Sequence, residues 1–182
     1  MKKFTALQIT TLGLMLSMIF VLSTLEGALF PLPFHMRFGL SNVVTMYALF
    51  FMGKRAALTL TAMKSLSVLL TRGPIAGLLS LSGGMLSLLA IALLATAWRG
   101  ASYFLLSVAG AVTHNMAQLA VASWLASTNL LFFLLPLMAG AGILAGSLTA
   151  VLLRVVMPLF KNLPFDRGVS FGDGQSTRVS RT

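Results

Sequence analysis

Cysteine is absent from the sequence, which excludes disulfide bonds, thiolate metal sites and cysteine nucleophiles. Acidic residues are almost as scarce: the chain of 182 residues has three, and Asp166 and Asp173 lie near its C-terminus. Glu26 is therefore the one acidic residue in the rest of the chain. No aspartate-rich cluster can hold magnesium around a diphosphate, and no phosphate-binding loop or nucleophile-elbow motif occurs. We predict that the chain is not itself an enzyme.

Histidine is also rare, and the spacing of the two histidines is not that of metal ligands. His35 and His114 lie far apart in the sequence, and neither has a carboxylate nearby. We therefore expect no metal site and no cofactor.

Hydrophobic residues, in contrast, make up 58% of the chain, and charged residues only 9%. A water-soluble domain with this composition would aggregate. Apolar runs long enough to cross a hydrocarbon core of roughly 30 Å recur along the chain, without the alternation of barrel strands. The sequence predicts an all-α integral membrane protein, a bundle of six transmembrane helices at residues 4–25, 39–52, 55–71, 74–98, 101–125 and 137–156.

The basic residues predict the orientation of this bundle, because Lys and Arg are retained on the cytoplasmic side. Arg37 and Arg72 fall on the predicted outer side, and Lys64 falls within the membrane. The other basic residues share the opposite side: Lys2, Lys3, Lys54, Arg55, Arg99, Arg154, Lys161, Arg167, Arg178 and Arg181. We predict a multi-pass protein of the cytoplasmic membrane with both termini in the cytoplasm.

The formal net charge of +10 does not indicate a nucleic-acid partner, because the charge is spread over short loops and a tail. We expect residues 1–160 to form the transmembrane domain. Residues 161–182 are too polar to offset their ordering entropy and are predicted to be a disordered cytoplasmic tail. The first predicted span is expected to be retained and not cleaved as a signal peptide. Residues 30–38, with two prolines, are predicted to form an outer loop folded back onto the bundle.

Lys64 is the first candidate for function, because a cation in the hydrocarbon core costs roughly 3 kcal/mol or more. Such a residue is usually retained with a partner or a ligand. Lys64 shares a predicted helix face with Ser67 and Thr71. Its counter-charge is predicted to be either Glu26 or an anionic ligand.

A second polar cluster lies in the fifth predicted span, where His114, Asn115 and Gln118 fall within an arc of about 100°. A similar pattern occurs near the outer end of the second span, at Ser41, Asn42 and Thr45. These hydroxyls can instead bond their own backbone, and the larger groups can form hydrogen bonds between helices. We predict one outward-facing substrate site formed by Lys64, His114, Asn115, Gln118, Asn42, Arg37, Arg72 and Glu26, with His35 as a further loop candidate.

Small residues four apart mark surfaces where helices can approach closely. The pair Gly13 and Ser17 lies in the first predicted span, and it is a candidate for contact with a partner protein. Similar stripes occur in the fourth and sixth spans, where packing within the bundle is the favoured interpretation: Ser80, Gly84 and Ser87, and Gly142, Gly146 and Ala150.

Three stretches resemble a known family: RFGLSNVVTMYALF at residues 37–50, SLSGGMLSLL at 80–89 and AGAVTHNMAQL at 109–119. They are similar to the Gx transporter family, also described as heptaprenyl diphosphate synthase component I, over about residues 5–160. That family in turn resembles the substrate-binding S components of energy-coupling factor (ECF) transporters, which are six-helix membrane proteins with cytoplasmic termini.

The resemblance implies partners, namely a transmembrane coupling protein and two cytoplasmic ATPases. In S components a small-residue stripe of the first helix contacts the coupling protein, and here Gly13 and Ser17 occupy that stripe. We therefore predict an S component that captures a vitamin-like, flavin-like or isoprenoid-phosphate-like solute from outside. The alternatives are an accessory membrane subunit of polyprenyl diphosphate or quinone biosynthesis, and a stand-alone secondary transporter.

Overall fold

In the computed structural model, the described residues are 6–29, 41–98, 100–127 and 129–160, and they form six helices. The side chains of residues 6–8, 26–29, 130–132 and 156–160 lie outside this description. The helices are α1 (Ala6–Leu29), α2 (Asn42–Phe51), α3 (Lys54–Arg72), α4 (Pro74–Ala97), α5 (Tyr103–Ala126) and α6 (Leu130–Phe160). The predicted all-helical class is confirmed.

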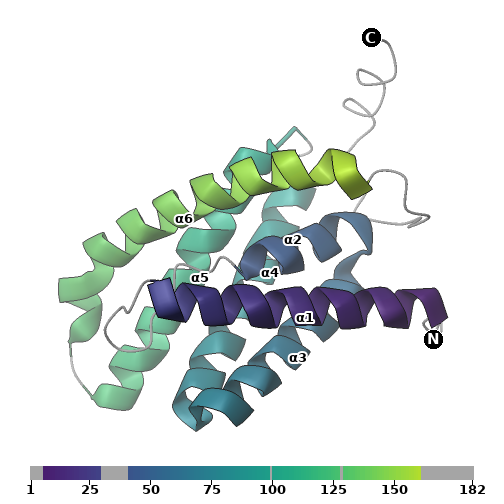
Figure 1. Cartoon of the computed structure of the whole chain (residues 1–182). Helices are drawn as coiled ribbons and strands as arrows, with labels where there is room; N and C mark the ends of the chain where they lie inside the picture. The colour runs from purple at the N-terminus through teal and green to yellow at the C-terminus, as the bar shows by residue number, and fades with distance from the viewer. Residues whose placement is uncertain (1–5, 30–40, 99, 128, 161–182) are drawn as a thin grey trace.

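Consecutive helices from α3 to α6 pack side by side, and α5 and α6 make the most extensive contact. Helix α1 crosses in front of α2 and α3, which are the helices it contacts most (Figure 1). The last helix, α6, passes over the opposite side of α2 (Figure 1). Helix α1 is thus an outer element of the bundle, held mainly by α2 and α3.

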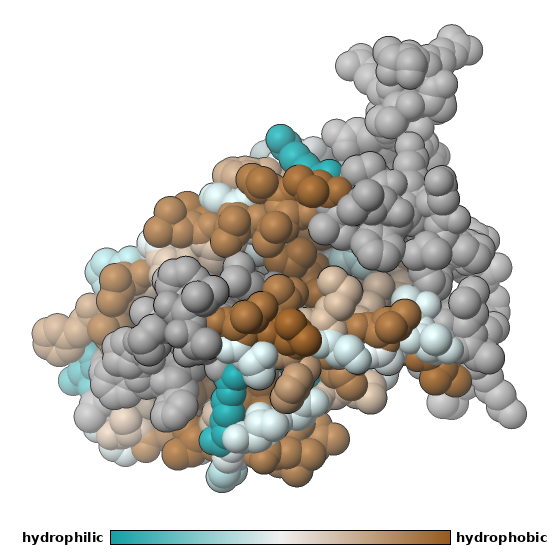
Figure 2. All heavy atoms as spheres, in the orientation of Figure 1, coloured by the Kyte–Doolittle hydropathy of each residue, from teal (hydrophilic) through white to brown (hydrophobic). Residues whose placement is uncertain are grey.

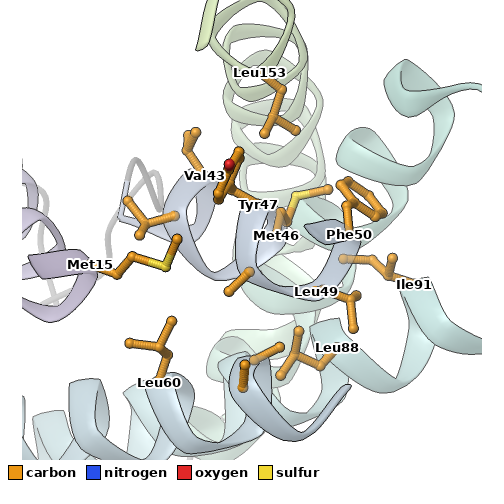
Figure 3. Close-up of a cluster of buried hydrophobic side chains, with 14 of the residues drawn as sticks. Met15, Val43, Met46, Tyr47, Leu49, Phe50, Leu60, Leu88, Ile91 and Leu153 are labelled. Atoms are coloured by element: carbon orange, nitrogen blue, oxygen red, sulfur yellow. The ribbon is translucent and has the colours of Figure 1, made fainter. Parts of the chain in front are cut away.

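Helix α2 is buried around almost its whole circumference, as expected for an apolar helix at the centre of a bundle. Its side chains Val43, Met46 and Phe50 meet residues from α1, α3, α4 and α6 in one cluster (Figure 3). With 10 residues, α2 is roughly 15 Å long, about half the hydrocarbon thickness. The second predicted span therefore contains a short central helix, and the first residue of this helix, Asn42, lies inside the protein.

A single glycine makes the sharp turn between α3 and α4. Gly73 has φ +91°, a conformation that L side chains rarely adopt, and its N–H donates to the carbonyl of Leu69. Pro74 then begins α4, where its missing N–H costs no helical hydrogen bond. This turn places the end of α3, with Arg72, directly beside the beginning of α4.

Glycines also allow the close approach of helices that the sequence predicted for the sixth span. A Cβ on Gly146 would lie 2.5 Å from the Cα of Val108, and one on Gly142 would lie 2.8 Å from the Cα of Val112. The stripe on α6 therefore packs within the bundle, against α5, as predicted. Helix α6 begins seven residues before the predicted start of the span, because the helix continues through Pro136.

Three helical segments of the described chain are long and apolar enough to cross a membrane, namely Pro74–Ala97, Tyr103–Ala126 and Phe133–Val155. Shorter apolar helices are present at Ile9–Leu25 and Asn42–Phe51. Hydrophobic residues make up most of the coloured surface in Figure 2. The fold is that of a helical membrane protein with several candidate spans.

Candidate functional site

Lys64 lies in the middle of α3 and is only 6% exposed. Its ammonium donates a hydrogen bond of 2.6 Å to Oδ1 of Asn42, at the beginning of α2. The short connection between α2 and α3 brings these residues together, although they are 22 positions apart. An amide oxygen therefore provides part of the solvation that the buried cation has lost.

Arg72 lies on the same face of α3 as Lys64, eight residues further along. Its guanidinium donates a hydrogen bond of 3.1 Å to the backbone carbonyl of Ser23 in α1. Val68, midway between the two bases, lines the same space. The end of α3 is thus tied to α1 by a charged donor.

Two of the three polar side chains predicted in α5 face these bases. His114 and Gln118 are buried, and Nε2 of His114 lies 3.1 Å from Nε2 of Gln118. The third, Asn115, is directed towards α6, where its amide donates a 3.2 Å hydrogen bond to the carbonyl of Met138. Asn115 therefore joins α5 to α6 and does not line the cavity of His114 and Gln118.

These side chains surround a cavity of about 30 Å³, which we call the Lys64 cavity. It is lined by Ser23, Ser41, Lys64, Val68, Arg72, Ala76, Leu79, Ser80, His114 and Gln118. Five helices or their immediate ends contribute, from α1 to α5. The space has room for one or two water molecules. Its described lining contains two cationic side chains, Lys64 and Arg72, and no acidic side chain.

Gly83 of α4 allows the His114 ring to lie against the helix backbone, because a Cβ there would come within 2.8 Å of Nδ1. Nδ1 of His114 is buried, and no hydrogen-bond partner is found for it among the described residues. Oδ1 of Asn115 and Oγ1 of Thr61 are in the same situation.

Several hydroxyls of the predicted polar faces bond their own helices. Thr45 donates to the carbonyl of Asn42, Ser67 to that of Met63 and Thr71 to that of Ser67. This agrees with the alternative that Ser and Thr satisfy themselves locally. Ser41 behaves differently, because it lines the Lys64 cavity.

Two lining residues, Ser23 and Ser80, were missed as site residues by the sequence reasoning. Ser80 lies 3.4 Å from Ser65, so the two hydroxyls join α3 to α4 beside the cavity. A signal for Ser23 was present, since between residues 9 and 25 of α1 the buried side chains are Leu12, Met15, Ile19 and Ser23, at helical spacing. Among these four residues, Ser23 is the polar one.

Three predicted site residues cannot be placed in the cavity. Glu26 belongs to α1, but its side chain lies outside the described residues, as do His35 and Arg37 entirely. Within the described part of the chain, no group of three His, Cys, Asp or Glu residues could hold a metal ion.

Gly13 and Ser17 lie on the outer side of α1, where both are exposed. Ser17 donates a hydrogen bond of 3.0 Å to the carbonyl of Gly13, and a Cβ on Gly13 would meet nothing within 4 Å. The described part of the bundle leaves this small-residue surface uncovered.

The six helices and the enclosed basic cavity define a helical membrane protein with a polar site inside its bundle. The chain belongs to the heptaprenyl diphosphate synthase component I family, whose model matches residues 15–156. The match includes every residue that lines the Lys64 cavity. No curated protein and no solved structure shows a significant match to the chain.

Proposed function

We propose that the protein is the substrate-binding membrane subunit of an ECF-type importer, and that it captures a small anionic solute at the Lys64 cavity. The observation that carries the proposal is the convergence of Lys64, Arg72, His114 and Gln118 on one cavity whose described lining has no acidic group. The two cations would bind carboxylate or phosphate oxygens, and the imidazole and amide would bind further polar atoms.

Capture of a solute larger than a few water molecules requires the cavity to widen. Helix α1 is the element best suited to move, because it is an outer helix held mainly by α2 and α3. The hydrogen bond from Arg72 to Ser23 would break in this opening and form again on closure. A separate ATPase module would drive release into the cytoplasm, since the chain has no nucleotide-binding motif of its own.

The proposal is tested by mass spectrometry of small molecules that co-purify with the protein in mild detergent. We expect an anionic compound with the wild-type protein and its loss from Lys64→Ala. The matched control is Lys54→Ala, because Lys54 lies on the same helix and is exposed. If Lys64→Ala is folded and retains the compound as well as Lys54→Ala does, the site assignment is wrong.

The second candidate function is that of an accessory subunit in prenyl diphosphate synthesis. It is favoured by the name of the family, heptaprenyl diphosphate synthase component I. It predicts that the synthase activity of a soluble catalytic partner rises when this chain is added in lipid vesicles. The importer instead predicts uptake that requires ATP and a coupling module. Uptake by this chain alone, driven by an ion gradient, would identify a secondary transporter.

A further inference from the structure

A second cavity, of about 60 Å³, lies between α1 and α3 and shares four lining residues with the Lys64 cavity. Ser23, Lys64, Val68 and Arg72 line both cavities. The residues that belong to the second cavity alone form what we call the α1–α3 seam: Leu16, Ile19, Phe20, Thr24, Ser67 and Thr71. The buried Lys64 and the partly buried Arg72 therefore lie between the two cavities.

The α1–α3 seam differs chemically from the Lys64 cavity. Leu16, Ile19 and Phe20 supply hydrocarbon along its α1 side. The hydroxyls of Thr24 and Thr71 donate to carbonyls of their own helices, so their donor hydrogens are not directed at a guest. The α1–α3 seam is therefore a mainly apolar part of a cavity that the cationic side chains of Lys64 and Arg72 also line.

The seam reaches the apolar surface of the bundle. Phe20 lines the seam and is 48% exposed, and Leu70, on the neighbouring turn of α3, is 75% exposed. Figure 2 shows mainly hydrophobic surface on α1, with hydrophilic residues below it, over the end of α3. In a membrane protein such apolar surface faces lipid chains. A path thus leads from the bilayer, between α1 and α3, to Lys64 and Arg72.

We propose that the solute is an anionic amphiphile, a chain-bearing phosphate, which enters from the bilayer through the α1–α3 seam. Its head group binds at Lys64 and Arg72, and its chain lies along Leu16, Ile19 and Phe20. This inference depends on the proposed function, because it takes the Lys64 cavity as the ligand site. A water-soluble anion would use only the Lys64 cavity and would leave the apolar seam without a role.

The test measures binding of n-decyl phosphate to the full chain in nanodiscs of zwitterionic lipid, by calorimetry. Because each buried methylene contributes about fourfold in affinity, we expect decyl phosphate to bind at least about a hundredfold more tightly than inorganic phosphate. We expect decanol, which lacks the anion, not to compete. The variant Lys64→Met, which removes the charge without creating a large cavity, should lose decyl phosphate binding.

Variants of the α1–α3 seam distinguish the contact made by the alkyl chain of decyl phosphate from the contact made by its phosphate group. Leu16→Trp fills the seam and Phe20→Ala removes part of its wall, and each should weaken decyl phosphate binding by about tenfold, the loss of two methylene contacts. The matched controls are Leu14→Trp and Val21→Ala, because both residues are exposed on α1 and do not line the seam. Partition of the probe into the bilayer is the same for every variant and cancels in the comparison.

Three results would show that the solute is not an anionic amphiphile. They are no saturable binding of decyl phosphate, equal affinity for inorganic phosphate, and seam variants that match their controls. If anion binding still requires Lys64 in any of these cases, the proposed function stands without the seam. If no anion depends on Lys64, the proposed function itself fails.

Discussion

At the scale of single residues, a hydrogen bond to Asn42 offsets part of the free-energy cost of burying the Lys64 ammonium. The Asn42 amide oxygen accepts a hydrogen bond from the ammonium, but a neutral amide does not neutralise its charge. At the Asn42 position an amide does not compete with an anionic ligand, whereas a carboxylate there would. The pairing of lysine with asparagine is thus suited to binding.

This leads to a prediction for Asn42→Asp. The new carboxylate should form an ion pair with Lys64, so anionic ligand binding should weaken by about tenfold or more while stability is kept. The measurements are decyl phosphate affinity and the thermal unfolding temperature in the same nanodiscs. Asn129→Asp, at an exposed position, serves as the control for added charge. Equal affinity of the two variants would contradict this account of the site.

Gly83 provides a second prediction at the residue scale. In Gly83→Ala the new Cβ would lie 2.7 Å from Cε1 of His114, so the ring must shift from its position beside Gln118. We expect a loss of about 1–3 kcal/mol in the free energy of unfolding, together with weaker ligand binding. Denaturation in mixed micelles measures the first effect and calorimetry the second. An unchanged free energy of unfolding and unchanged ligand affinity in Gly83→Ala would show that the His114 ring can shift without cost.

At the scale of helices, the strength of packing differs across the bundle. Helices α5 and α6 approach so closely that Gly146 faces the backbone of Val108. Helix α1, in contrast, makes fewer contacts and borders both cavities. The α5–α6 pair is therefore expected to be the rigid part of the molecule, and α1 the element that moves during binding.

Two Gly→Ala substitutions in α6 test whether the α5–α6 pair is the rigid part of the molecule. Gly146→Ala should lower the free energy of unfolding by about 1–3 kcal/mol, since the Cβ would lie 2.5 Å from a backbone atom. Gly140→Ala should be neutral or stabilising by up to about 1 kcal/mol, because its Cβ would meet nothing within 4 Å. Unfolding of both variants in one detergent provides the comparison. Equal effects would show that α5 and α6 can separate without cost.

At the scale of the whole molecule, the two sides of α1 have different roles. Its inner residues, among them Ile19 and Ser23, border the cavities, while Gly13 and Ser17 lie exposed on the outer side. In the importer proposal the outer side receives the coupling protein. A coupling protein bound there would act on the same helix that closes the cavity.

The double variant Gly13→Leu with Ser17→Leu separates these roles. Bulky side chains at both positions should prevent close contact with a partner helix, so assembly with the coupling protein should be lost. Ligand binding should be retained, because neither residue lines a cavity. Co-purification with a tagged coupling protein and decyl phosphate calorimetry provide the two measurements. An intact complex would place the partner contact elsewhere.

The sequence by itself determined that this is an all-helical membrane protein, because the length and apolar character of its runs leave few other ways to satisfy the backbone in lipid. It also determined which polar residues share a helix arc, since each residue turns the helix by about 100°. Only the tertiary structure decided how each helix is rotated against its neighbours. That rotation directs His114 and Gln118 to the Lys64 cavity and Asn115 to the carbonyl of Met138. It also brings the Asn42 amide to Lys64, a contact between two helices that no spacing within one helix can reveal.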